Sequence, residues 1–294
     1  MSVLIESPLP NRTYRAKVRD TYDLGERLLI VATDRISAYD LVLPTGIPDK
    51  GKVLSQMSAW WFERTKNVVP NHFIRVADGT PADDLPFALP PELIGRSTIA
   101  RKAKRVDVEC IVRGYLSGSA WVEYQKWGTV NGLRLPKGMQ ESEQLSEPLF
   151  TPTTKAEEGH DEPMTFSDLM QEVGPESAQV LRLRSIALYN FAADYARERG
   201  IIIADTKFEF GFYEGELIVI DEILTPDSSR FWAIDDYKIG VPQASFDKQY
   251  VRDWLSQSGW NKEPPAPELP PEVVDGTARR YREAYRLLTG QAVD

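Results

Sequence analysis

The sequence predicts a globular protein that contains both strands and helices. Residues 201–220 alternate apolar and polar side chains in the pattern of a β hairpin, whereas residues 52–66 and 271–288 carry apolar side chains at helical spacing. The chain has 294 residues, of which 42% are hydrophobic and 27% charged, so it is long enough for one large domain or two modest ones.

Composition disfavours several classes of protein. The formal net charge of -9 argues against a nucleic-acid partner, whose binding protein usually shows a basic surface. Cys110 is the single cysteine, which rules out an intramolecular disulfide, and with only two histidines a zinc site is disfavoured. No apolar run reaches the ~20 residues of a membrane span, and the N-terminal segment does not resemble a signal peptide. We therefore expect a cytoplasmic protein without a nucleic-acid or membrane partner, and monomer and homo-oligomer both stay open.

The other elements follow from periodicity and turn-forming residues. Runs of β-branched and apolar residues predict strands, and Pro175 at the first turn and Gly200 beyond the last predict a long helix between them. The predicted strands lie at 28–32, 72–76, 97–103 and 106–113. Shorter helices are predicted at 165–172 and 245–256, and a further one ends at residue 127. The predicted loops cover 78–95, 132–148 and 150–163.

The hairpin at 201–220 offers a test of strand register. Pairing Phe212 with Ile218 would place every apolar side chain on one face, and a slip by one residue would mix the two faces. The favoured register sets Glu209 directly opposite Asp221 on the other face, with Lys207 beside them. The apolar set comprises Phe208, Phe210, Phe212, Ile218 and Ile220.

Two carboxylates that close together repel each other unless a cation lies between them. Mg²⁺ that carries nucleotide phosphates is the natural candidate, because it is usually held by one or two carboxylates and by phosphate oxygens. Glu209 and Asp221 are therefore candidate metal ligands. The alternative is a surface hairpin whose acids face water, with Lys207 in a weak ion pair.

Cationic and hydroxyl side chains elsewhere suit phosphate groups. Residues 14–22 predict two strands and a turn that carry Lys17 and Arg19, although no Walker loop is present. Ser119 opens a helix just after Arg113, and Arg230 ends a polar loop beyond Asp221, so these three could bind one anion. A solvated edge strand and an ordinary serine cap are the alternatives.

Two further segments are candidates for substrate contacts. Residues 33–40 follow a strand directly, where polar side chains such as Asp34 and Ser37 meet ligands, although turns stabilised by their own side chains would explain them too. A polar run as long as 150–163 is usually functional or disordered in a compact domain. We expect Lys155 to reach a transferring phosphoryl group, and His160 and Asp161 to orient a substrate.

Four runs of residues together resemble the signatures of the phosphoribosylaminoimidazole-succinocarboxamide synthase (SAICAR synthetase) family. They are K-V-R-D at 17–20, T-D-R-I-S-A-Y-D at 33–40, E-C-I-V-R-x-x-x-S-G-S at 109–119, and I-I-A-D-T-K-F-E-F-G with D-E-I-L-T-P-D-S-S-R-F-W at 202–232. The resemblance covers nearly the whole chain in order. Two departures stand out: Ala16 replaces the usual glycine before the lysine, and Asp107 replaces the usual proline before Glu109.

The resemblance implies an α+β fold with two lobes. Residues 1–105 would form an N-terminal, mostly antiparallel β lobe like those of kinases and ATP-grasp proteins, and residues 106–294 a larger α+β lobe, with ATP in the cleft. The cationic bend at 102–105 would be the hinge, and the adenine ring would dock on backbone groups of residues 102–108. The implied reaction joins L-aspartate to the carboxylate of carboxyaminoimidazole ribonucleotide through an acyl phosphate, with ATP as co-substrate and Mg²⁺ as cofactor.

The motifs and the resemblance together give each candidate residue a role. Lys155, Lys207 and Asp205 would be catalytic, and Glu209 and Asp221 would bind the metal. Nucleotide contacts are expected from Lys17, Val18, Arg19, Lys102 and Glu109, and substrate contacts from Arg113, Ser119, Arg230, Asp34, Ser37 and Asp161.

Two other functions remain alternatives at this stage. A small-molecule kinase of related architecture would use a similar metal site, but the chain lacks the H-R-D pattern of a kinase catalytic loop. A nucleotide-binding protein without catalysis would not need Lys207 beside two acids. ATP turnover measured with and without L-aspartate, in the presence of the ribonucleotide, separates all three.

Overall fold

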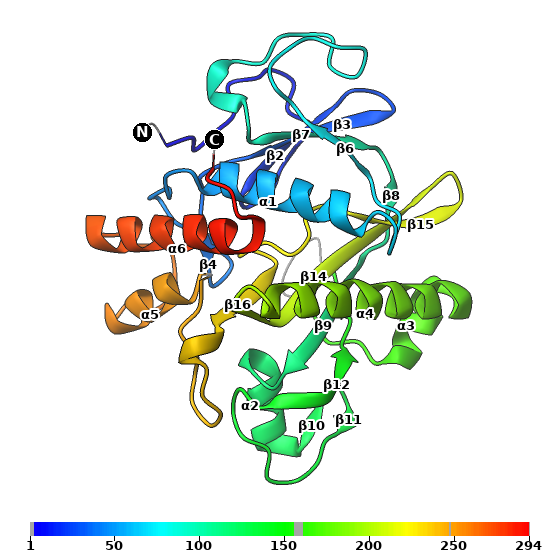
Figure 1. Cartoon of the computed structure of the whole chain (residues 1–294), viewed down its shortest axis with the longest axis vertical. Helices are drawn as coiled ribbons and strands as arrows, with labels where there is room; N and C mark the ends of the chain where they lie inside the picture. The colour runs from blue at the N-terminus through cyan, green and yellow to red at the C-terminus, as the bar shows by residue number, and fades with distance from the viewer. Residues whose placement is uncertain (1–2, 156–160, 247, 294) are drawn as a thin grey trace.

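The computed structural model describes residues 3–155, 161–246 and 248–293. Two antiparallel sheets dominate it (Figure 1), and the α+β class predicted from the sequence is confirmed. The smaller sheet has five strands in the order β1-β2-β3-β7-β6, all drawn from the first 101 residues. Its strands are β1 (Tyr14–Arg15), β2 (Arg19–Asp23), β3 (Arg27–Ala32), β6 (Phe73–Val76) and β7 (Ser97–Arg101).

The larger sheet has seven strands arranged around β14 (Ile201–Tyr213). β14 pairs with β9 and β16 along its first part and with β8 and β15 along its second part. Its neighbours in the sheet are β8 (Lys104–Arg105), β9 (Val108–Tyr115), β12 (Gln144–Phe150), β13 (Thr153–Thr154), β15 (Glu216–Ile220) and β16 (Ser229–Ala233). The sequence predicted a loop at 132–148, and that prediction was wrong for residues 144–148, which lie in β12, and for residues 133–134, which form the short strand β11.

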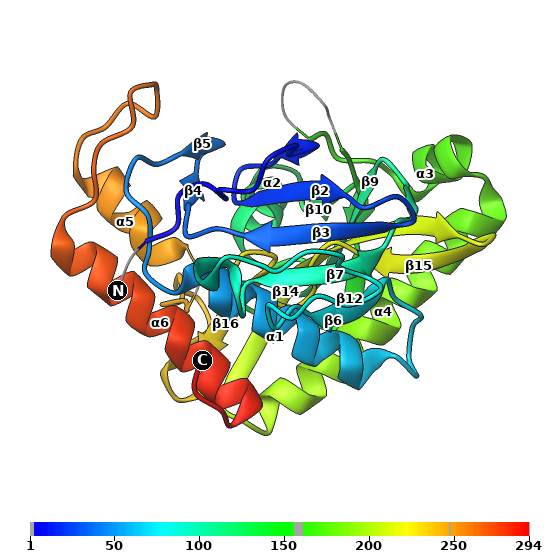
Figure 2. The same ribbon diagram turned by 90° about the horizontal axis from the view of Figure 1, so that it is seen from above.

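Helices cover the sheets and close the core. α1 packs on both β3 and α6, and α4 lies along β14 (Figures 1 and 2). The helices are α1 (Lys50–Thr65), α2 (Gly118–Trp127), α3 (Phe166–Val173), α4 (Pro175–Arg197), α5 (Gln249–Gln257) and α6 (Pro271–Thr289). Two short hairpins and two 3-10 turns complete the elements: β4 (Ser37–Ala38), β5 (Leu41–Val42), β10 (Thr129–Val130), β11 (Leu133–Arg134), Pro91–Leu93 and Ile234–Asp236.

Local chemistry explains where the helices begin. Thr165 and Asp168 form a reciprocal capping box at the start of α3, and prolines occupy the first turns of α4 and α6, where a missing N–H costs nothing. The main core joins α1 to the large sheet through fully buried aromatic side chains, among them Trp61, Phe208 and Phe231. Because α1 belongs to the first third of the chain yet shares this core, the division at residue 105 stays a prediction.

No helix in the described part of the chain is long and apolar enough to cross a membrane.

The register predicted for the hairpin of β14 and β15 was wrong by one residue. Glu209 lies opposite Ile220, and Phe212 lies opposite Leu217. The prediction assumed one apolar and one polar face, but residues 217–220 are all buried, so both faces of β15 pack against protein. Phe212, assigned to the buried face, is 38% exposed.

The turn sets the register instead. Glu214 and Gly215 have φ values of 50° and 83°, and the flanking Tyr213 and Glu216 pair directly. Positive φ at both central residues is typical of the two-residue turn that matches the twist of a hairpin, and this turn fixes which residues face each other.

Replacing Gly215 by Ala should therefore lower the free energy of unfolding by about 1 kcal/mol, because a side chain at positive φ is strained. The space around Gly215 is open, so backbone strain is the only cost. Urea unfolding measures the change. Glu214→Asn is the matched variant and should be neutral or stabilising, since Asn tolerates positive φ better. An unchanged midpoint for Gly215→Ala would contradict this account of the turn.

Candidate active site

Strand β14 carries three charged side chains at alternate positions, Asp205, Lys207 and Glu209. Alternate positions share one face of a strand, so all three point the same way. The opposite face carries Phe208 and Phe210, which are fully buried in the main core. The polar face of the central strand is therefore the floor on which the rest of the candidate site is built.

A cluster of acids and lysines occupies one end of this floor. Lys207 Nζ lies 2.5 Å from Glu209 Oε1, 3.2 Å from Glu109 Oε1 and 4.0 Å from Asp221 Oδ2. Lys155 Nζ donates to the same oxygen of Glu209 and lies 3.7 Å from Glu109. Although the register differs from the prediction, Glu209 and Asp221 do converge on Lys207, because Asp221 follows β15 with φ of 68° and turns back towards β14.

Two groups of this cluster, Lys207 and Glu209, are held in their charged forms. Burial alone would lower the pKa of Lys207, but Glu209, Glu109 and Asp221 outweigh it and raise that pKa above its usual range. Burial would likewise raise the pKa of Glu209, yet Lys207 and Lys155 hold it well below the ordinary value. The cluster thus holds an ionised Glu209 between Lys155 and Lys207.

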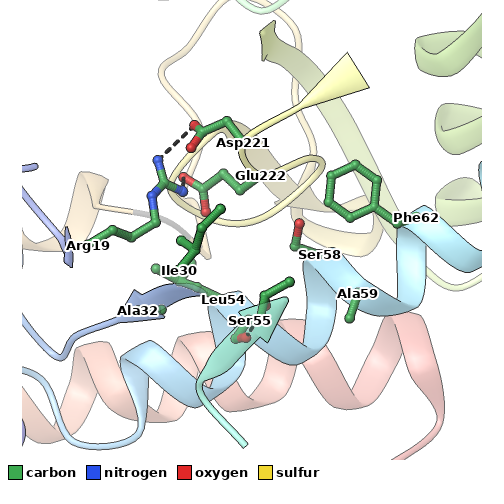
Figure 3. Close-up of a pocket in the computed structure, with 11 residues that line it drawn as sticks. Arg19, Ile30, Ala32, Leu54, Ser55, Ser58, Ala59, Phe62, Asp221 and Glu222 are labelled. Atoms are coloured by element: carbon green, nitrogen blue, oxygen red, sulfur yellow. Dashed lines mark hydrogen bonds and ion pairs between the residues drawn. The ribbon is translucent and has the colours of Figure 1, made fainter. Parts of the chain in front are cut away.

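Arg19 joins the smaller sheet to this cluster. Its guanidinium reaches from β2 to Asp221 Oδ2 at 2.7 Å and to Glu222 Oε1 at 3.0 Å (Figure 3). Burial would lower its pKa, but the two acids raise it. Below these groups, side chains of α1 such as Ser58 and Phe62 line a cavity of about 20 Å³ (Figure 3). A space of that size holds about one water molecule and excludes a substrate.

A larger cavity opens between the smaller sheet and the hairpin of β14 and β15. Its volume is about 240 Å³. Its lining includes the apolar side chains of Leu28, Ile30, Ala103 and Ile220 and the charged side chains of Arg19, Lys155, Glu209 and Asp221. Apolar side chains beside cations suit a nucleotide, whose base packs against apolar groups and whose phosphates bind cations.

A row of charges crosses the other end of the floor. Arg113 of β9 and Arg230 of β16 lie in register with Asp205, one on each side of it. Arg113 Nη1 is 3.5 Å from Asp205, and Arg230 Nη1 donates to the same carboxylate. Arg113 also donates to Thr151 Oγ1 at 3.0 Å and to Ser119 Oγ at 3.4 Å. The predicted trio Arg113, Ser119 and Arg230 therefore lies together around Asp205.

Two cavities flank this row. One, of about 660 Å³, is lined by Arg113, Ser119 and Asp161, and the other, of about 400 Å³, by Ser117, Gly118 and Arg230. Gly118 has φ of 57°, and a Cβ there would lie 2.3 Å from the Arg230 guanidinium. Glycine at 118 is therefore needed for Arg230 to approach the start of α2.

Several predicted residues lie away from these groups. Lys17 pairs with Asp40 at 2.5 Å and Lys102 with Asp23 at 2.5 Å, both at exposed positions, and Val18 is buried. His160 lies outside the described residues.

Asp34 and Ser37 are also buried. Asp34 accepts hydrogen bonds from the amides of Leu4 and Gly51 and lies 2.9 Å from Arg96, so its oxygens hold the protein's own segments together. Ser37 Oγ accepts from Lys248 Nζ at 3.5 Å. We leave Asp34 out of the proposed substrate site because its carboxylate is engaged by three protein groups and is fully buried.

Sequence reasoning missed a second buried charge cluster behind the loop 221–230. Asp227 accepts from Lys50 Nζ at 2.7 Å and from Tyr281 Oη at 2.7 Å, and Lys248 Nζ lies 3.3 Å away. Lys50 and Tyr281 are fully buried. These residues come from α1, α6 and the start of α5, and no spacing in the sequence could have paired them. The cluster anchors the loop that carries Asp221 at one end and Arg230 at the other.

Comparisons with known proteins place this geometry in a family. The family model for SAICAR synthetase matches residues 12–267. The phosphoribosylaminoimidazole-succinocarboxamide synthases of Thermodesulfovibrio yellowstonii and Desulfosudis oleivorans are 55% and 54% identical to this chain, over 94% and 95% of it and 94% and 96% of their own lengths. The chain belongs to the SAICAR synthetase family.

A solved structure of a SAICAR synthase has the same fold as this chain. The Saccharomyces cerevisiae SAICAR synthase in complex with SAICAR superposes with a TM-score of 0.87 at 43% identity, covering 99% of this chain and 98% of that one. The two-lobed fold that the resemblance implied is thereby confirmed. SAICAR synthetases ligate L-aspartate in an ATP-dependent step of purine biosynthesis, and this chain is a ligase of that family.

The cluster around Asp227 gives a prediction about stability. Asp227→Asn should lower the free energy of unfolding by about 3–5 kcal/mol, because it leaves the buried Lys50 ammonium without its carboxylate. The double variant Lys50→Met with Asp227→Asn removes both charges and should recover much of the loss. Urea unfolding measures the free energy of unfolding of the single and the double variant. Equal losses in both would mean that the ion pair itself is not what stabilises the loop.

Proposed function

We propose that this chain joins L-aspartate to the carboxylate of carboxyaminoimidazole ribonucleotide through an acyl phosphate, with ATP cleaved to ADP and phosphate. One observation carries the proposal. The acid–lysine cluster on β14 lies between a cavity suited to a nucleotide and the row of Arg113, Asp205 and Arg230 suited to a second anion. A phosphoryl donor and its acceptor could thus meet over a single strand.

The nucleotide would occupy the cavity of about 240 Å³, with its base against Leu28, Ile30 and Ile220. Its phosphates would then lie beside Lys155 and Lys207, whose ammonium groups would leave their carboxylates for phosphate oxygens. The adenine contact at 102–108, and the contacts of Lys17, Val18 and Lys102, stay predictions from the sequence. Ala103 and Arg105 line the cavity, which supports the contact at 102–108.

The residues present fit Mg²⁺. Glu209 and Asp221 offer hard carboxylate oxygens, and the ammonium of Lys207 already lies among three carboxylates that favour a cation. Within the described ranges, no group of three or more His, Cys, Asp or Glu could hold a metal by itself. That agrees with an ion whose remaining ligands come from phosphate and water. When bound, Mg²⁺ would neutralise charge on the transferring phosphoryl group.

The residues of the chain would act by position and charge. The ribonucleotide carboxylate attacks the γ-phosphorus and ADP leaves; the aspartate amine then attacks the acyl carbon, and phosphate leaves with the amine proton passing to solvent. Lys155 and Lys207 would stabilise the phosphoryl charge, which is the main task in such transfers. Asp205 would orient Arg113 and Arg230, and these with Ser119 would hold the ribonucleotide phosphate. Asp161 lines the same cavity as Arg113.

The assay that tests the proposal measures ADP release in four mixtures. ADP should form only when ATP, the ribonucleotide and L-aspartate are all present at steady state. A kinase would release ADP without aspartate. Release of ADP without the ribonucleotide, or no release in any mixture, would overturn the proposed function.

Replacing Asp221 by Asn should lower kcat by roughly 100-fold or more, because one metal oxygen and its charge are lost. Binding of ADP should also lose its dependence on Mg²⁺, which calorimetric titrations at several Mg²⁺ concentrations would measure. Glu222→Gln is the matched control, since Glu222 faces the same Arg19 but is not a proposed metal ligand. If Asp221→Asn kept the wild-type dependence of ADP binding on Mg²⁺, the assignment of the metal site would be wrong.

Replacing Arg113 by Ala should raise the apparent KM for the ribonucleotide by about 10- to 100-fold, the equivalent of one charge-assisted hydrogen bond. The KM for ATP should change little, because the acid–lysine cluster is untouched. Arg113→Lys should rescue only part of the loss, since it keeps the charge but not the fork. A loss confined to ATP would overturn the assignment of this end of the floor.

A further inference from the structure

The loop 16–19, which borders the cavity of about 240 Å³, is held from behind by one buried arginine. Ala16 and Arg19 line that cavity. On the other side, Arg35 Nε donates to the carbonyl of Lys17 at 3.0 Å, and Arg35 Nη2 donates to the carbonyls of Ala16 at 3.0 Å and Arg19 at 3.2 Å. The loop therefore has three of its four backbone oxygens on Arg35 and the side chains of Ala16 and Arg19 at the cavity.

Asp20 completes the anchor. Arg35 Nη2 lies 2.9 Å from Asp20 Oδ1, and the two side chains are 2% and 0% exposed. Asp20 is the last residue of the run K-V-R-D, and Arg35 belongs to T-D-R-I-S-A-Y-D, so this ion pair joins two of the four motifs. Thr33, from the second motif, donates its hydroxyl to the carbonyl of Val18 at 2.8 Å and its amide at 2.9 Å.

We propose that Arg35 is a positioning residue for ATP, which fixes the backbone of residues 16–19 over the nucleotide without itself touching it. Glycine-rich phosphate loops gain close approach from backbone freedom and must be ordered when the ligand binds. Here Ala16 precedes the lysine, and the guanidinium fork satisfies three carbonyls at once, so the loop is ordered before the nucleotide arrives. This inference rests on the proposed function, because it deepens the role of the nucleotide cavity.

Arg35→Lys tests the idea. Lysine keeps a charge opposite Asp20 but lacks the planar fork that reaches several carbonyls. Amide hydrogen exchange of residues 16–19 in the ligand-free protein should quicken about tenfold. The KM for ATP should rise about tenfold, because the loop loses its ordering. The kcat and the ribonucleotide KM should stay nearly unchanged, since Arg35 donates to residues 16, 17, 19 and 20 and to the carbonyl of Ile5, and none of these belongs to the row of Arg113, Asp205 and Arg230.

Arg96→Lys is the matched control. Arg96 is an equally buried arginine paired with an aspartate, Asp34, but it contacts the start of α1 rather than the loop. Its replacement should lower the melting temperature while exchange at 16–19 and the KM for ATP stay at wild-type values. An equal rise of the ATP KM in Arg96→Lys, or an equal rise of both substrate KM values in Arg35→Lys, would show a general structural effect and overturn the proposal.

Thr33→Val is a second variant that removes one donor to the loop at nearly constant volume. This variant should raise both the amide exchange rate of residues 16–19 and the KM for ATP, by a smaller factor than Arg35→Lys. If Arg35→Lys fails to fold, Thr33→Val tests whether the contacts behind the loop order it. Unchanged exchange at 16–19 in a folded variant would refute the anchor. The exchange comparison needs no turnover, so it tests the anchor even if the ADP-release assay overturns the proposed function.

Discussion

The structure depends on neutralising the charges that β14 carries into the middle of the molecule. Asp205, Lys207 and Glu209 lie on a strand with neighbours along both edges, where water cannot solvate them fully. An ion buried without a partner costs several kcal/mol. The arginines of β9 and β16 lie beside Asp205, and Lys155 pairs with Glu209. Lys207 pairs with Glu209 of the same strand and with Glu109 of β9. Segments distant in the sequence therefore supply partners for these charges.

The same requirement links the two sheets and prepares the site for its ligands. Arg19 reaches from the smaller sheet to Asp221 and Glu222, and the ion pair of Arg19 with Asp221 lines part of the cavity between the sheets. In the proposed function, the carboxylates that pair with Lys155 and Lys207 would also bind the metal ion. Entry of a metal nucleotide would exchange one set of ion pairs for another, with the carboxylates passing to the cation and the lysines to the phosphates. Little new charge would then have to be desolvated when the nucleotide binds.

The hairpin of β14 and β15 shows where pattern reasoning fails. Hydrophobic alternation specifies register only when one face is exposed, and residues 217–220 are buried on both faces. The turn at Glu214 and Gly215 carried the decisive information, since two residues with positive φ force Tyr213 to pair with Glu216. Glu209 and Asp221 converge all the same, because convergence depends on the bend at Asp221 and not on the register. The conclusion about the two acids held, while the pairing from which it was drawn did not.

The sequence by itself determined the elements with strong periodicity, the α+β class and the set of charged residues in the candidate site. Alternation at 205–209 put three charges on one face, and the motifs at 109–119 and 221–232 supplied Arg113, Ser119, Asp221 and Arg230. Only the tertiary structure decided which charges meet. Lys50, Asp227 and Tyr281 are far apart in the chain and have no shared period, and Arg35 reads as a loop residue until its guanidinium is seen against the carbonyls of 16–19. The physical reason is that spacing along a chain encodes contacts within one helix or hairpin, whereas the partner of a buried charge is chosen by the packing of separate elements.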